Sequence, residues 1–256
     1  MPAMNLADHT AHYRRDAEYF DYFAPRSGAD LDAACRIQQA VLAAMPAVSS
    51  GAVLDLGSGD GWLHAALASR TRTAERNDTA AVVVSCDLGI NNLRKIRQRQ
   101  PAALLVAADA GRLPFRDGSF EVVVASEVLE HLNAPGDVVR ALANILAPKG
   151  RIVVTTPYRE TIRYSLCIHC NEPTPVNAHL HSFDESALGT FFMDAGLARI
   201  RHETFQNKAM VFLRLSYFLR FLPWRLWRVI DRLCNFVYPK PHSIVMTGDR
   251  IETHAP

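Results

Sequence analysis

The feature that most constrains the fold is a repeated alternation of short apolar runs with longer amphipathic runs. Valine fills much of the short runs, which favours strands, and strands that are apolar throughout are typical of parallel sheets covered on both faces. The alternation therefore predicts an α/β fold with a doubly wound, mostly parallel sheet. The predicted strands are Val53–Leu56, Ala81–Cys86, Leu104–Ala107, Glu121–Ala125 and Arg151–Thr155, and the predicted helices are Trp62–Arg70, Asn91–Gln100 and Ala134–Leu146.

Length and charge limit the classes of protein to which this chain can belong. A chain of 256 residues, 49% of them hydrophobic, can bury the core of one α/β domain with some additional elements. The 28 Lys and Arg nearly balance the 26 Asp and Glu, so we expect no nucleic-acid partner. We also expect a cytoplasmic protein, because residues 1–30 lack a secretory signal, the five cysteines are scattered and no run of apolar residues is long enough to span a membrane.

A glycine-rich turn follows the first predicted strand, in the stretch V-L-D-L-G-S-G-D-G-W-L from Val53 to Leu63. Its glycines let the backbone turn tightly and approach a ligand. The dinucleotide pattern G-x-G-x-x-G fails, because its third glycine would fall at Trp62. Asp55, at the end of the strand, would repel a pyrophosphate and attract an ammonium group. The small residues of the turn are Gly57, Ser58, Gly59 and Gly61.

Two more carboxylates follow the next two strands. Asp87 ends V-S-C-D-L, where it can accept hydrogen bonds from the hydroxyls of a ribose. Asp109, in A-A-D-A, can accept one from an adenine amino group while the Ala110 N–H meets a ring nitrogen. Each aspartate alone could be a helix N-cap or a turn residue. Together with Asp55, at these spacings, they predict a socket for an adenosine that carries a methionine chain.

Three stretches of the chain resemble class I S-adenosylmethionine-dependent methyltransferases, the family that includes the ubiquinone-biosynthesis methylases. They are D-L-G-S-G-D-G, A-A-D-A-G-R-L-P-F-R-D-G-S-F-E-V-V-V-A-S-E-V-L-E-H-L and L-A-P-K-G-R-I-V-V-T-T-P, and the similarity covers about residues 50–157. The resemblance implies a Rossmann-like sheet of seven strands whose last strand is antiparallel. It also implies that the cofactor contacts Asp55, Gly57, Ser58, Gly59, Gly61, Asp87, Leu88, Asp109, Ala110, Ser126 and Glu127.

The function that follows from the resemblance is methyl transfer by in-line displacement to a small-molecule or lipid-linked acceptor, by O- or C-methylation. His131 is the candidate general base by its position after the fourth strand, and the alternative is that it only packs or caps a helix. Two other functions stay open. One is a catalytically silent subunit with the same fold, and the other is a nicotinamide-dependent oxidoreductase, which Asp55 and Trp62 disfavour.

On this basis we divide the chain into five segments. Residues 1–50 form an N-terminal helical cap, and residues 51–157 form the cofactor-binding core. Residues 158–208 supply a loop, a helix and a strand on the acceptor side. Residues 209–237 form an α-helical insertion before the last strand, which lies with a tail in residues 238–256.

A cysteine- and histidine-containing segment follows the fifth predicted strand. Cys167 and Cys170 have the two-residue gap of a zinc knuckle, and His179 and His181 could complete a tetrahedral structural zinc site. Two alternatives stay open. In the first, the thiols are reduced and the histidines line the acceptor pocket. In the second, His181 caps the helix that begins near Ser182–Asp184.

The insertion contains a second helix that we predict to begin after Pro223 and to be amphipathic. Its basic face carries Arg225, Arg228, Arg232 and Asn235, and its apolar face carries Trp224, Trp227, Ile230, Leu233 and Val237. This composition is typical of a helix that lies in a membrane interface, which predicts peripheral contact with an anionic membrane and a lipophilic acceptor. The alternative is that the helix packs on the sheet, covers the acceptor pocket or forms a dimer contact.

Overall fold

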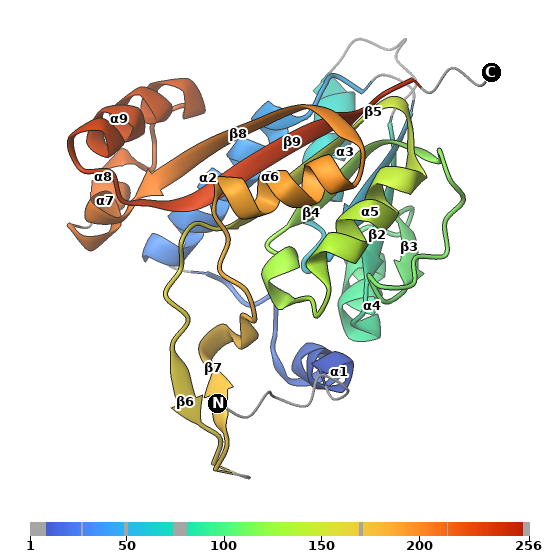
Figure 1. Ribbon diagram of the computed structural model, residues 1–256, viewed down its shortest axis with the longest axis horizontal. Coiled ribbons are helices and arrows are strands. Elements are labelled where there is room, and N and C mark those ends of the chain that lie inside the picture. Colours follow the sequence, from blue (N-terminus) through green and yellow to red (C-terminus); the bar gives the residue numbers. More distant parts are fainter. Residues whose placement is uncertain are drawn as a thin grey trace.

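The computed structural model describes residues 9–26, 28–48, 51–73, 81–168, 171–213 and 215–252. A seven-stranded sheet forms its centre, with the strand order β3-β2-β1-β4-β5-β9-β8 (Figure 1). The first five strands pair in parallel, and β9 lies antiparallel between β5 and β8. The predicted fold class is confirmed. The strands of this sheet are β1 (Ala52–Leu56), β2 (Val82–Asp87), β3 (Leu104–Ala107), β4 (Phe120–Ser126), β5 (Leu146–Pro157), β8 (Leu197–Asn207) and β9 (Pro241–Arg250).

Helices cover both faces of the sheet, and a separate hairpin projects from it. The hairpin consists of β6 (Tyr164–Leu166) and β7 (Pro173–Pro175), and short 3-10 helices span Leu129–His131 and Val176–Ala178. The α-helices are α1 (His9–Tyr19), α2 (Gly28–Ala44), α3 (Trp62–Thr73), α4 (Ile90–Arg99), α5 (Pro135–Ile145), α6 (Glu185–Asp194), α7 (Lys208–Phe212), α8 (Leu215–Leu219) and α9 (Trp224–Val237).

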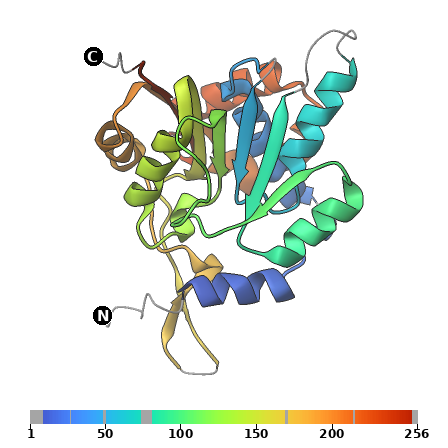
Figure 2. The same ribbon diagram turned by 90° about the vertical axis from the view of Figure 1, so that its right-hand side faces the viewer.

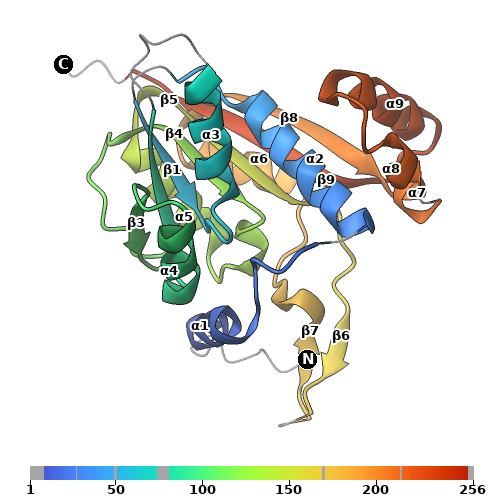
Figure 3. The ribbon, with the colours of Figure 1, turned by 180° about the vertical axis from the view of Figure 1, so that it is seen from behind.

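The buried valines of the central strands alternate between two cores. Val123 packs with α5 and α6 on one face, whereas Val122 and Val124 pack with α2 and α3 on the other. The two layers are seen from opposite sides in Figure 1 and Figure 3. Because successive residues of a strand point to opposite faces, a run without polar residues is what a sheet covered on both sides requires.

The N-terminal helix and the hairpin lie at one edge of the sheet. Figure 2 shows α1 across the carboxyl ends of the parallel strands, with β6 and β7 beside it. Tyr13 of α1 donates a hydrogen bond of 2.9 Å to the carbonyl oxygen of Ala178, in the segment that follows β7. The elements that enclose this edge are therefore linked to one another.

The helical insertion follows β8, and the predicted division of its faces is wrong. Three helices form it, and α9 begins directly after Pro223. Arg228 was expected on an exposed basic face, but its side chain is only 6% exposed and forms an ion pair with Asp231 at 2.5 Å and another with Glu203. Trp227 is buried beside it. Arg228 and Asp231 can be buried against the sheet because their charges pair there.

The exposed surface of the insertion is instead largely apolar. In α9 the exposed residues Leu226, Val229, Leu233 and Phe236 recur at helical spacing, with the exposed Arg225 and Arg232 among them. Phe212 of α7 and Phe218 of α8 are also exposed. In the ranges that the structure describes, no helix has the length and hydrophobicity needed to cross a membrane.

Candidate functional site

A cavity of about 480 Å³ lies where the parallel strands end, beneath α1. Its volume is in the range of small-molecule and cofactor sites. Carboxyl ends of parallel strands beside a switch in strand order are where such sheets bind ligands. The lining residues are Tyr13, Tyr22, Leu56, Gly57, Gly59, Asp87, Leu88, Gly89, Asn92, Ala108, Asp109, Ala110, Gly111, Glu127, Val128, His131, Leu132, Asn133, Ala134, Asp137, Val138 and Ala141.

The glycine turn after β1 is held in an unusual backbone conformation. Gly57, Gly59 and Gly61 have φ angles of +69°, +51° and +76°, which residues other than glycine rarely adopt. An added Cβ at Gly57 would lie 2.5 Å from Cγ2 of Val128. The turn therefore requires glycine for its conformation and, at Gly57, for space as well. Gly57 and Gly59 line the cavity, whereas Gly61 and Ser58 lie outside its lining.

Asp87 connects the end of β2 to this turn. Its Oδ2 accepts a hydrogen bond of 2.9 Å from the N–H of Gly59, and its Oδ1 accepts one of 2.7 Å from the N–H of Gly89. The carboxylate is turned toward the cavity, which it lines. Burial raises its pKa, and the two N–H donors act in the opposite direction.

Asp55 lies deeper than the sequence suggested. It is 1% exposed and does not line the cavity, although Leu56 and Gly57, which follow it, do. Its Oδ2 is buried without a hydrogen-bond partner. Burial, with the nearby charges of Asp87 and Asp60, raises the pKa of Asp55 to about 8.

The loop after β3 forms a further part of the cavity wall. Asp109 and Ala110 both line it. Asp109 accepts a hydrogen bond of 2.8 Å from the N–H of Gly111, so the loop closes around its own carboxylate. Such a turn is one of the alternatives for a lone aspartate.

Glu127 follows β4 in a strained conformation. Its φ angle is +56°, a region that residues other than glycine rarely adopt and that is often found at functional sites. Burial raises the pKa of Glu127 to about 7, and the charge of Glu160 acts in the same direction. Glu127 lines the cavity, whereas its neighbour Ser126 bonds to Thr155 Oγ1 at 2.9 Å.

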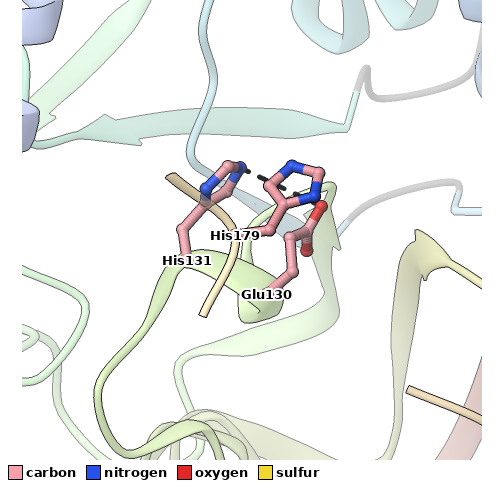
Figure 4. Close-up of side chains that lie close together, drawn as sticks. All are labelled: Glu130, His131 and His179. Atoms are coloured by element: carbon pink, nitrogen blue, oxygen red, sulfur yellow. Dashed lines mark ion pairs between the residues drawn. The ribbon is translucent and has the colours of Figure 1, made fainter. Parts of the chain in front are cut away.

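His131 belongs to a cluster that the sequence did not predict as a group. It lines the cavity, and ligand-type atoms of Glu130, His131 and His179 all lie within 4.8 Å of one another (Figure 4). His131 Nδ1 is hydrogen-bonded to the hydroxyl of Tyr13. Burial raises the pKa of Glu130 well above its usual range, and the charge of Glu127 adds to this.

The predicted zinc knuckle is not supported. His179 Nδ1 lies 2.5 Å from Oε2 of Glu160, and His181 Nε2 lies 2.8 Å from the carbonyl oxygen of Leu132. Within the described part of the chain, the metal-type cluster that contains His179 does not include Cys167. Cys170 lies outside the described residues.

The alternative that His181 caps a helix is also wrong. The N-cap of α6 is Asp184, whose carboxylate accepts hydrogen bonds from the N–H groups of Ser186 and Ala187. The loop histidines therefore turn toward the site and not toward the start of the following helix.

Several residues near the site were not predicted from the sequence as site residues, and four of them bear on its chemistry. Tyr13 and Tyr22 reach the cavity from the N-terminal segment, and Asn92 reaches it from α4. Glu160 meets His179 from the segment after β5. The aromatic residues of the first thirty positions were a visible signal for the two tyrosines, whereas nothing in the sequence brings Glu160 to His179.

Comparison with known proteins agrees with this geometry. The model of the methyltransferase domain family matches residues 54–154. A demethylmenaquinone methyltransferase of Beutenbergia cavernae is 34% identical over 117 residues, which are 46% of this chain and 45% of that protein. A probable S-adenosylmethionine-dependent methyltransferase of Mycobacterium tuberculosis is 28% identical over 156 residues, 60% of this chain and 52% of that protein.

Solved structures show the same fold. The crystal structure of an S-adenosylmethionine-dependent methyltransferase from Mesorhizobium loti matches with a TM-score of 0.59 and 18% identity, covering 84% of this chain and 98% of that one. The chain spans about half the length of the curated relatives it matches. The sheet order, the glycine turn and these matches agree that residues 54–154 belong to the family of class I S-adenosylmethionine-dependent methyltransferases.

Proposed function

We propose that the chain binds S-adenosylmethionine in the cavity and methylates an acceptor that enters beside it. The observation that carries this proposal is the joint position of the glycine turn and Asp87, with Asp109 and Ala110 on the adjoining wall. When bound, the cofactor supplies an electrophilic methyl group on a sulfonium. The chain's own task is then to orient the acceptor and to exclude water.

The residues present fit this cofactor. The positive φ angles of the glycine turn leave backbone free to approach a ligand, and Asp87 keeps acceptor lone pairs for ribose hydroxyls. Asp55 is buried with an unpartnered oxygen below the turn. An ammonium group near the turn would favour the ionised form of Asp55, although this residue does not line the cavity.

The acceptor side of the cavity carries two groups that can take up a proton. Burial brings the pKa of Glu127 to about 7, which suits a general base at neutral pH. His131, the base expected from the sequence, lines the same cavity with its Nδ1 held by Tyr13. A base of this kind serves O-methylation of a hydroxyl or C-methylation of an acidic carbon.

Calorimetric titration with S-adenosylmethionine and with NADH tests the cofactor. We expect binding of S-adenosylmethionine alone, weakened in Asp87→Ala. Binding of NADH alone would make the chain an oxidoreductase. Transfer of labelled methyl groups to soluble and membrane extracts then tests turnover, because a silent subunit would bind the cofactor and transfer nothing.

The exposed apolar face of the insertion supports a lipid-linked acceptor, such as a quinone-type precursor. Contiguous exposed apolar residues mark interaction surfaces. The exposed apolar residues of α9 include Leu226, Leu233 and Phe236, and Arg225 is exposed on the same helix. Apolar side chains that enter an interface while arginines meet lipid phosphates are a mode of peripheral membrane binding. Because β8 is parallel to β5, the insertion also starts at the sheet edge that carries the cavity.

Co-sedimentation with vesicles tests this part. The chain should pellet with anionic vesicles at low salt, and Leu233→Asp with Phe236→Asp should release it. Ile168→Asp is the matched control, because Ile168 is fully exposed on the distant hairpin. If the unaltered chain stays in the supernatant, the acceptor is a water-soluble small molecule.

A further inference from the structure

We propose that Glu130, His131 and His179 bind a divalent transition-metal ion at the wall of the cavity. Their ligand-type atoms converge within 4.8 Å from two separate segments, the 3-10 helix after β4 and the loop after β7. Figure 4 shows the two imidazole rings and the carboxylate close together. Two imidazoles and one carboxylate form a ligand set found in catalytic metal sites.

The hydrogen bonds of both rings assign the ring proton of each neutral histidine to Nδ1. Tyr13 donates its hydroxyl hydrogen to the carbonyl of Ala178, so toward His131 Nδ1 it acts as the acceptor. The carboxylate of Glu160 likewise accepts from His179 Nδ1 at 2.5 Å. In each neutral ring the lone pair then lies on Nε2. A carboxylate or hydroxyl that orients a histidine in this way is the usual outer partner of a metal ligand.

Glu130 provides an independent observation. It is 1% exposed, and both of its carboxylate oxygens are buried without a hydrogen-bond partner. A buried carboxylate of this kind is costly unless a cation pairs with it. Within the described ranges, neither Glu127 nor Glu130 forms an ion pair with a lysine or an arginine. The site therefore offers a buried carboxylate whose two oxygens have no hydrogen-bond partner and can coordinate a cation.

The distance between the ligand atoms, and a backbone hydrogen bond between the two segments that carry them, are compatible with a bound metal ion. Ligands about 2.1 Å from a tetrahedral ion lie about 3.4 Å from each other. His131 Nε2 lies 4.0 Å from Oε1 of Glu130, so small side-chain rotations are enough to close the site. The N–H of Leu180 donates to the carbonyl oxygen of Glu130 at 2.8 Å, which fastens the His179 loop to the 3-10 helix.

Three protein ligands leave coordination positions open. Since His131 also lines the cavity, an oxygen atom of the acceptor can take one of these positions, and with His131 bound to the metal the base is Glu127. This consequence rests on the proposed function and points to an acceptor with a hydroxyl or enol oxygen near the reacting atom. The metal site itself does not depend on it.

The experiment is a titration of the full chain with Co²⁺, after removal of metal with EDTA and dialysis. We expect one Co²⁺ per chain by calorimetry, with visible absorption bands of low-symmetry Co²⁺. His179→Ala and Glu130→Gln should each weaken binding by tenfold or more, roughly the loss seen when metal ligands or their partners are removed. His181→Ala and Cys167→Ser are the controls from the same segment, and both should bind as the unaltered chain does.

Each outcome bears on the proposal. Absence of stoichiometric binding, equal affinity in His179→Ala and Glu130→Gln, or loss of binding in Cys167→Ser would overturn it. If His179→Ala unfolds, Glu160→Gln replaces it, because the Glu160 carboxylate accepts from His179 Nδ1 and its loss should weaken binding by about tenfold. S-adenosylmethionine titrated into the same samples separates the two proposals, since cofactor binding without Co²⁺ binding refutes only the metal site.

Discussion

Asp87 accepts a hydrogen bond from the backbone N–H of Gly59 at 2.9 Å, and so joins the end of β2 to the turn that follows β1. A second N–H, that of Gly89, meets its other oxygen at 2.7 Å. The same carboxylate therefore shapes the turn and faces the cavity. Each of its oxygens accepts one backbone hydrogen bond and keeps a further lone pair that can accept a hydrogen bond from a ligand in the cavity.

Replacing Asp87 by Asn should weaken binding of S-adenosylmethionine by about 1.5–3 kcal/mol, because a charge-assisted acceptor is lost. One of the two backbone N–H donors also loses its partner. Calorimetry measures the affinity, and Asp194→Asn is the control because Asp194 is exposed in α6. Equal affinity in Asp87→Asn and the unaltered chain would remove Asp87 from the cofactor site.

Replacing Gly57 by Ala should lower the thermal unfolding midpoint. The added Cβ would have a positive φ angle of +69° and would lie 2.5 Å from Val128 Cγ2. Gly118→Ala is a matched control, because its φ angle is +70° but nothing lies within 4 Å of the added atom. We expect Gly57→Ala to cost about 1–3 kcal/mol more than the control. Adding Val128→Ala should restore part of the loss, and no restoration would show that the contact is not the cause.

The stability of the ligand-free chain should fall as pH rises. Unfolded aspartate has a pKa of about 4, whereas burial raises that of Asp55 to about 8 in the folded chain. Folding therefore takes up a proton between these values, and each such proton lowers stability by about 1.4 kcal/mol per pH unit as pH increases. Denaturant unfolding from pH 5 to 8 measures the slope. Asp55→Asn should reduce it, and an unchanged slope would contradict the assignment to Asp55.

Replacing Arg228 by Ala should destabilise the chain strongly. Asp231, whose side chain is 0% exposed, would lose its charged partner at 2.5 Å. Removing one member of a buried ion pair typically costs about 3–5 kcal/mol. Arg225→Ala on the exposed side of the same helix should change stability by less than about 0.5 kcal/mol. Urea unfolding of both variants checks this, and similar values for the two would mean that the buried pair contributes little.

The sheet could be predicted because its signal is local. The valines Val122, Val123 and Val124 are all buried, which shows within three residues that both faces of the strand are covered. Helical runs follow the first, second and fourth strands, as this fold requires. The sequence alone was enough to place Asp87 and Asp109 at one edge, because the carboxyl ends of parallel strands meet there.

The faces of α9 could not be predicted in the same way. Helical periodicity separates two stripes but does not say which stripe meets the sheet. Arg228 is buried because Asp231 and Glu203 satisfy it, and Glu203 comes from β8, outside the helix. The cluster around His179 could not be predicted for a related reason. Its partners Glu130 and Glu160 are remote in sequence, whereas the nearby pair of cysteines suggested a closer set of ligands.

The position of β9 has a consequence for the order in which the chain can assemble during synthesis. β8 pairs with β9 alone in this sheet, and β9 fills the gap between β5 and β8. During synthesis on the ribosome, the five parallel strands can pair with one another before residues 241–250 have been made. The edge of β5 that later pairs with β9 is then unpaired. Until these residues emerge, β8 has no neighbour and the edge of β5 stays exposed to other chains, which makes this interval the one in which a chaperone would matter most.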